Sequence, residues 1–120
     1  MIQVFGLANC DSTKAALKWL KQHNIESRLH DFKQEGVTAT ELGGWLTQIP
    51  LVQLLNRKST TWRGLTAAEQ AAAAQQKSAI RLMVKYPNLI KRPVVAWPGD
   101  RFTTGFNEKV FASLIKDDQE

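Results

Sequence analysis

The sequence predicts an α/β fold in which a βαβ unit and a ββα unit flank a helical insertion. A β-rich run, a helical pattern and a second strand pattern follow one another within residues 2–32. A hairpin signal and an amphipathic helix end the chain, and the apolar spacing between the two units is helical. The 120 residues fit a single domain with one core, and we expect the insertion to span about residues 37–88.

The βαβ unit begins with the apolar run IQVF (2–5), which favours a strand. Residues 11–23 are expected to form a helix, because one of its faces would carry Thr13, Ala16, Leu17 and Leu20. Asp11 or Ser12 can cap the start of this helix. The alternating pattern of IESRLHDF (25–32) predicts a second strand, and the spacing of the three elements predicts a right-handed parallel connection.

Helical spacing dominates the insertion. One pattern ends before Pro50 and comprises Leu42, Trp45, Leu46 and Ile49. LVQLL (51–55) predicts a further helical turn, and Thr66 opens an alanine-rich helix. A last core-facing pattern ends at YPN (86–88) and comprises Ala79, Leu82, Met83 and Tyr86.

The ββα unit follows this insertion. PVVAW (93–97) and RFTTGF (101–106) flank a turn signal, in which Pro98 and Gly99 suit the two central positions of a type II turn. Asn107 can cap a closing helix, one face of which would carry Val110, Phe111, Leu114 and Ile115. This order of elements is the connectivity of a thioredoxin-like fold.

Composition restricts the functional classes. No stretch approaches the roughly 20 apolar residues that a membrane-spanning helix needs, and MIQVFG (1–6) lacks the pattern of a secretion signal. We therefore expect a cytoplasmic protein that does not enter the membrane. The single cysteine, Cys10, cannot form an internal disulfide, and with His23 and His30 it provides too few ligands for a zinc site. No bound metal is expected.

The net charge of +5 is compatible with nucleic acid binding, but the basic residues are scattered. They fall on the polar side of the first helix and in a loop: Lys14, Lys18 and Lys21, and Arg57, Lys58 and Arg63. No aromatic residues are interleaved with them to stack on bases. The pattern favours a solvated surface or a site for a small anion, and nucleic acid is not expected as a partner.

Cys10 lies where the first strand gives way to the first helix. Unpaired N–H groups and the dipole of a helix start stabilise a thiolate, so we expect the pKa of Cys10 to fall. Asp11 opposes this shift if its carboxylate faces the sulfur. Ser12 and Thr13 either donate hydrogen bonds to the thiolate or a bound carboxylate, or merely cap the helix. The alternative for Cys10 is a small buried side chain.

The segment NLIKRPVVAW (88–97) favours the reactive interpretation of Cys10. In thioredoxin-like proteins, a cis proline precedes the strand that enters the hairpin and lies across from the first helix; Pro93 occupies this place. Arg92 would then bring a permanent cation toward Cys10, or it is a solvated charge at the strand end.

Several further residues have two interpretations. Arg57 and Arg63 bracket KSTTW (58–62), which either holds a carboxylate of glutathione or is a solvated loop pinned by Trp62, and we favour the second. His23 and His30 are interpreted as structural, because neither has a metal-ligating or catalytic partner in the pattern. Three tryptophans are interpreted as core or rim residues: Trp19, Trp45 and Trp97.

Three separated motifs resemble, in order, the arsenate reductase family, also called the ArsC/Spx family, and in particular its small YffB-like branch. The motifs are MIQVFGLANCDSTKAALKWL (1–20), LLNRKSTTWRGL (54–65) and YPNLIKRPVVAWPGDRFTTGF (86–106). The resemblance covers nearly the whole chain and implies a thioredoxin-like fold. It also implies that Cys10 is the catalytic thiolate and that Arg92 is the catalytic arginine before the cis proline.

The family's other oxyanion-binding arginines match only in part. One falls by register at Asn56, with Arg57 one position later, and another falls near Thr104 and Gly105, where no arginine stands. We therefore expect thiol transfer or reduction of another acceptor rather than arsenate reduction. We expect substrate-binding roles for Asp11, Ser12, Thr13, Asn56, Arg57 and Pro93.

These features predict a monomeric, monothiol oxidoreductase without a bound cofactor and with glutathione as co-substrate. Because Cys10 is the only cysteine, glutathione or a glutaredoxin-type thiol protein must release the product. The alternative is a non-catalytic, Spx-like regulator that binds RNA polymerase. In Spx-type proteins a CxxC pair senses oxidation, whereas CDST (10–13) places Thr13 at the second position. This disfavours a redox-regulated version and leaves protein binding open.

Overall fold

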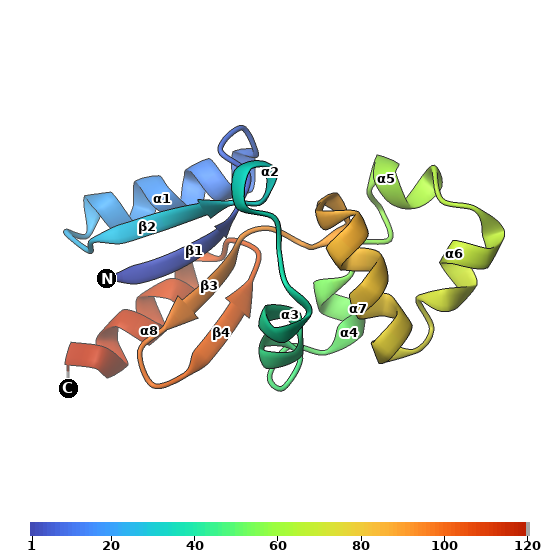
Figure 1. The fold of residues 1–120 in the computed structure, drawn as a ribbon. Helices are drawn as coiled ribbons and strands as arrows, with labels where there is room; N and C mark the ends of the chain where they lie inside the picture. The colour runs from blue at the N-terminus through green and yellow to red at the C-terminus, as the bar shows by residue number, and fades with distance from the viewer. Residues whose placement is uncertain (120) are drawn as a thin grey trace. The chain divides into compact units, whose positions relative to one another are not determined.

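A computed structural model of the chain describes residues 1–119, with side chains described as far as Ile115. The chain divides into two compact units, shown in Figure 1. The first, the sheet unit, comprises Met1–Gln34 and the chain from Arg92 onward, and the second, the helical unit, comprises Glu35–Lys91. The organisation as one domain with an insertion at about 37–88 stays a prediction.

The sheet unit contains four strands in the order β2-β1-β3-β4. Their bounds are Ile2–Gly6 for β1, Ser27–Asp31 for β2, Val94–Trp97 for β3 and Arg101–Thr104 for β4. β1 pairs parallel with β2 and antiparallel with β3, and β3 pairs antiparallel with β4. This arrangement confirms the predicted α/β, thioredoxin-like fold.

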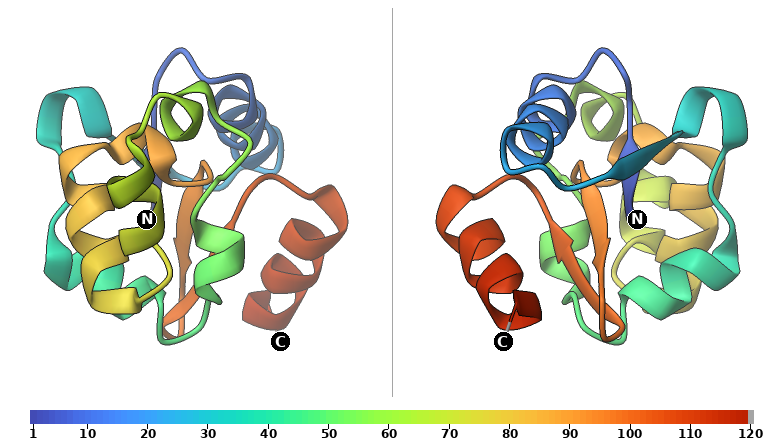
Figure 2. Two further views of the ribbon diagram at one scale, coloured as in Figure 1. Left: turned by 90° about the vertical axis from the view of Figure 1, so that its right-hand side faces the viewer. Right: turned by 90° about the vertical axis from the view of Figure 1, so that its left-hand side faces the viewer.

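Two helices, α1 (Asp11–Gln22) and α8 (Glu108–Gln119), lie on the same side of the sheet (Figure 2). They enclose a core with the sheet that comprises Ile2, Val4, Ala16, Trp19, Leu20, Val95, Trp97 and Phe111. The ring of Phe111 meets Trp19 and Trp97 edge to face, with centroids 5.4 and 4.9 Å apart. The core interpretation of these two tryptophans is confirmed, whereas Val110 is 43% exposed and was wrongly placed on the buried face of α8.

The start of α1 differs from the prediction. Cys10 is the N-cap, because its φ of −87° and ψ of 128° are extended and the helix begins at Asp11. The expectation that Asp11 or Ser12 caps the helix is therefore wrong, and no side chain forms the cap hydrogen bond. At α8 the predicted cap is confirmed, since the Val110 N–H donates to Asn107 Oδ1 at 3.1 Å.

The β3–β4 hairpin turns through residues 98–100. Gly99 has a φ of +80°, as the third position of a type II turn requires, and Asp100 follows with a φ of +56°. The register Trp97↔Arg101 closes the loop. The Trp97 indole N–H donates to Thr103 Oγ1 at 2.9 Å, which satisfies the polar edge of a buried ring.

The helical unit is built from short helices after α2 (Phe32–Glu35), which follows β2 directly. They are α3 (Ala39–Trp45), α4 (Leu51–Leu54), α5 (Thr60–Arg63), α6 (Ala67–Ala72), α7 (Gln76–Lys85) and the 3₁₀ turn η1 (Pro87–Leu89). The predicted core positions are buried at Leu42, Trp45, Ile49, Ala79, Leu82 and Met83. Thr66 caps α6 in a reciprocal capping box with Glu69. Among the helices within residues 1–119, none has the length and apolar character needed to cross a membrane.

Candidate active site at the start of helix α1

Cys10 stands at the edge of the sheet where the parallel strands β1 and β2 both end. The chain leaves β1 at Gly6 and makes a tight turn, in which the Cys10 N–H donates to the Leu7 carbonyl at 3.1 Å. The Cys10 carbonyl then accepts from the Lys14 N–H at 2.9 Å, which starts α1. The thiol is half-buried and not in a disulfide. It is therefore not sealed in the core.

Three influences set the pKa of the Cys10 thiol. Partial burial raises the pKa. Hydrogen bonds from the backbone N–H and the hydroxyl of Thr13 lower it, as do a hydrogen bond from the Arg92 guanidinium and the charge of that group, and together these outweigh the effect of burial. The net pKa lies below its ordinary value of 9.0. The direction is the one expected from the sequence, and it favours the nucleophilic thiolate.

Thr13 is packed tightly between the end of β1 and the thiol. Its side chain is fully buried. A Cβ atom on Gly6 would lie only 2.5 Å from Thr13 Oγ1. The missing side chain of Gly6 thus provides the space that Thr13 occupies, and the hydroxyl proton can turn toward the thiolate.

Asp31 is a residue that sequence reasoning missed. It is the last residue of β2 and the register partner of Gly6. Its Oδ2 accepts from the Ala8 N–H at 3.1 Å, and its Oδ1 accepts from the Lys33 N–H at 2.8 Å. The carboxylate therefore holds the loop that leads into Cys10. The available signal was an acidic residue at the end of the strand predicted to pair with β1.

Arg92 and Pro93 lie directly before β3. Their peptide bond is cis, as expected for a thioredoxin-like fold. Arg92 is half-buried, and its guanidinium lowers the pKa of Cys10 through a hydrogen bond and through its charge. The catalytic role of Arg92 stays a prediction. Pro93 is fully buried and its carbonyl accepts from the Gly105 N–H at 2.9 Å. Its substrate-binding role stays a prediction.

Asp11 and Ser12 form the first turn of α1 next to Cys10, and both are exposed. Asn56 and Arg57 belong to the helical unit. There, Asn56 Oδ1 accepts from the Lys58 N–H at 3.0 Å, and the Arg57 guanidinium lies 5.5 Å from the centroid of the Trp62 ring. Binding of a substrate by any of these four residues stays a prediction.

The two histidines have local partners. His23 Nδ1 pairs with the Trp19 carbonyl at 2.8 Å, and its ring stacks on Trp19 at 3.9 Å. His30 pairs with Gln3 and stacks on Phe5 at 4.7 Å. These contacts are typical of structural histidines. Within residues 1–119, no three His, Cys, Asp or Glu side chains are grouped so as to hold a metal ion.

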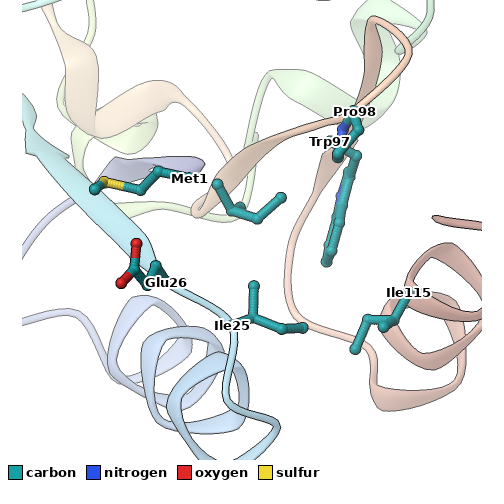
Figure 3. A pocket seen from close by; sticks show the side chains of 7 residues that line it. Met1, Ile25, Glu26, Trp97, Pro98 and Ile115 are labelled. Atoms are coloured by element: carbon teal, nitrogen blue, oxygen red, sulfur yellow. The ribbon is translucent and has the colours of Figure 1, made fainter. Parts of the chain in front are cut away.

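A cavity of about 410 Å³ opens at the other end of the sheet unit (Figure 3). It is lined by Met1, Ile2, Ile25, Glu26, Trp97, Pro98 and Ile115. Met1 and Glu26 precede β1 and β2, whereas Cys10 follows the carboxyl end of β1, so the cavity and the thiol are separated by the length of the sheet. We therefore take the Cys10 region as the candidate active site.

Comparison with known proteins places the chain in a family. The model of the ArsC family matches residues 5–114, which include Cys10 and Arg92. An uncharacterized protein of Haemophilus influenzae is 43% identical over 116 residues, which cover 96% of this chain and 99% of that protein. Global transcriptional regulator Spx of Listeria innocua is 24% identical over 110 residues, which cover 90% of this chain and 82% of the regulator.

Solved structures are similar over nearly the same length. The YFFB (PA3664) protein superposes with a TM-score of 0.87 at 34% identity, covering 95% of this chain and 98% of that protein. An arsenate reductase (ArsC) related protein from Brucella melitensis superposes with a TM-score of 0.71 at 35% identity, covering 96% and 94%. These coverages include residues of both the sheet unit and the helical unit.

Proposed function

This chain belongs to the ArsC family, and from that premise we propose that it is a glutathione-dependent thiol reductase whose nucleophile is the Cys10 thiolate. The observation that carries the proposal is the position of Cys10 at the start of α1, where Thr13 and Arg92 lower its pKa. A thiol with a lowered pKa is ionised in a larger fraction at neutral pH, and the thiolate is the attacking species.

The first step we propose is attack on a mixed disulfide between glutathione and another thiol. The Cys10 thiolate attacks the glutathionyl sulfur, and a bond forms between the two sulfurs as the substrate's S–S bond breaks. The electron pair of the broken bond leaves on the substrate sulfur, which takes a proton from water. Cys10 is then joined to glutathione in a mixed disulfide.

The second step needs a thiol from outside the chain, because Cys10 is the only cysteine. A second glutathione, as thiolate, attacks the glutathionyl sulfur and releases the Cys10 thiolate. The substrate ends as a reduced thiol and the two glutathionyl groups end as one disulfide, so the electrons balance. A glutaredoxin-type thiol protein can take the same role as donor.

Thr13 and Arg92 act on Cys10 both before and after the attack. Their hydrogen bonds favour the thiolate as nucleophile, and they favour it again as leaving group in the second step. The Arg92 guanidinium keeps its charge at all relevant pH values, so its contribution does not titrate. Neither residue exchanges a proton in this scheme.

The remaining predicted residues are proposed as contacts for the substrate. Asp11 and Ser12 are exposed beside Cys10 and are available to a bound glutathionyl group. For Asn56, Arg57 and Pro93, the proposal rests on the family resemblance. We propose the cytoplasm as the location, because glutathione is kept reduced there.

A second candidate function is that of a binding protein similar to Spx. It is favoured by the 24% identity with the Listeria innocua regulator over 110 residues. The single cysteine limits such a protein to a role without an internal dithiol switch. We place it second because protein binding alone gives no reason for a thiol with a lowered pKa.

The two candidates are separated by the intact mass of the protein after incubation with glutathione disulfide. We expect the wild-type protein to gain one glutathionyl group that reduced glutathione removes, and Cys10→Ser to gain none. Turnover of a glutathionylated peptide with reduced glutathione should be lost in the same variant. An unchanged mass and no turnover would contradict the reductase, and retention of RNA polymerase by Cys10→Ser in a pull-down would then favour the regulator.

A further inference from the structure

We propose that Asp31 is a positioning residue for the Cys10 loop, since its two carboxylate oxygens each accept a hydrogen bond from a backbone N–H, one from Ala8 in that loop and one from Lys33. This inference rests on the proposed function, because it concerns the same thiol. Asp31 does not touch the sulfur in this role. It acts through the backbone that carries Cys10.

The carboxylate is fixed at both of its oxygens and at its backbone. The Lys33 N–H holds Oδ1 at 2.8 Å, which prevents the group from rotating away from the loop. Parallel pairing places Asp31 opposite Gly6, at the edge where the loop begins. Oδ2 can therefore meet the Ala8 N–H at 3.1 Å, two residues beyond the end of β1.

The loop from Leu7 to Cys10 needs such a restraint because its other hydrogen bond is local. Ala8 and Asn9 are exposed, and the Cys10 N–H bonds within the turn to the Leu7 carbonyl. The Ala8 bond instead joins the loop to a strand 23 residues further along the chain. Hydrogen bonds to ionised groups are strong, so this contact restrains the loop more than a neutral pair would.

The orientation of Cys10 matters because the groups that stabilise its thiolate are directional. Hydrogen bonds weaken steeply once their angle falls below about 120°. If the loop relaxes, the sulfur shifts relative to the Thr13 N–H and the Arg92 guanidinium, and the thiolate loses stabilisation. Loss of the Asp31 restraint should therefore raise the pKa of Cys10.

Electrostatics alone predicts the opposite sign. Removing a nearby negative charge favours an anion, so a purely electrostatic role for Asp31 would make the pKa of Cys10 fall in Asp31→Asn. A purely structural role would lower the stability of the fold without a defined effect on the pKa. The sign of the shift thus distinguishes positioning from both other roles.

The experiment measures the rate of Cys10 alkylation by iodoacetamide as a function of pH. In Asp31→Asn and Asp31→Ala we expect the pKa of Cys10 to rise by about half a unit or more, so that alkylation at a pH below the pKa of either protein slows about threefold. Asp31→Glu keeps the charge and an acceptor, and it should recover part of the rate. Asp100→Asn, which removes a carboxylate from the hairpin turn, is the matched control and should not change the rate.

Urea unfolding of each variant shows whether it is folded under the assay conditions. An unchanged or lowered pKa of Cys10 in folded Asp31→Asn overturns the proposal. Because alkylation needs neither glutathione nor an enzymatic substrate, the result stands even if the protein shows no thiol transfer. Conversely, normal thiol transfer together with an unshifted pKa in Asp31→Asn would reject the role of Asp31 alone.

Discussion

Gly6→Ala is expected to destabilise the protein through one contact at the candidate site. The new Cβ would lie 2.5 Å from Thr13 Oγ1 and 3.1 Å from Thr13 Cγ2, and real Cβ atoms essentially never approach another heavy atom within 3.0 Å. Thr13 is fully buried, and its β-branched side chain has few rotamers in a helix, so it cannot swing aside. Overpacking of this kind costs about 1–3 kcal/mol, and the two close contacts place Gly6→Ala at about 2 kcal/mol.

The same contact predicts a strong coupling between the two positions. Thr13→Ala removes Oγ1 and Cγ2, and the closest remaining contact to the new Cβ is then 3.3 Å. Alanine also costs less conformational entropy than glycine in a strand, by about 0.5–1 kcal/mol. In the Thr13→Ala background, Gly6→Ala should therefore cost less than about 1 kcal/mol.

Urea unfolding of the wild type, both single variants and the double variant measures this coupling. We expect the cost of Gly6→Ala to fall by at least about 1 kcal/mol when Thr13 is alanine. Costs that agree within about 0.3 kcal/mol in the two backgrounds would mean that the residues are independent. The packing of Thr13 between Gly6 and Cys10 would then be refuted.

Three further predictions concern the same unit. Arg92→Ala should raise the pKa of Cys10 and slow its alkylation at pH 6. The control Arg28→Ala, at an exposed position of β2, should leave the alkylation rate unchanged. Equal rates in the wild type and Arg92→Ala would contradict the role of the guanidinium. The pKa of Cys10 in the folded protein lies below its ordinary value of 9.0. At a pH between the folded pKa and 9.0, the unfolded state binds more protons than the folded state, so the free energy of unfolding should rise with pH across that window. As the pH falls through the folded pKa, this stabilisation is lost. If the difference in the free energy of unfolding between the wild type and Cys10→Ser does not vary with pH, the pKa of Cys10 is not lowered by folding. Asn107→Ala removes the acceptor of the Val110 N–H and should lower the free energy of unfolding in urea by about 1 kcal/mol. Asn107→Asp keeps an acceptor and should retain most of that stability.

Local patterns predict the elements of this fold because they depend on residues that are close in the sequence. The alternation in residues 25–32 and the cap at Asn107 each predict a feature that the structure contains. The N-cap of α1 was misassigned because Asp and Ser rank above Cys as capping residues. The backbone at Cys10 is nevertheless extended, so the helix begins one residue after the thiol.

The site itself depends on contacts between distant residues. Cys10 and Arg92 were predicted together only because the connectivity and the resemblance bring their segments to one edge of the sheet. Asp31 was missed because its hydrogen bond with the Ala8 N–H depends on the register of β1 against β2, which the sequence does not show. Gly6 was missed as well, since the space it leaves for Thr13 is a property of the packed structure.

The most direct test is a pH titration of the Cys10 thiolate by its ultraviolet absorbance, with Cys10→Ser as the blank. We expect a single transition with a pKa clearly below 9.0, because the Thr13 N–H, its hydroxyl and Arg92 favour the charged form over the cost of partial burial. A transition at or above 9.0 would contradict the proposed nucleophile.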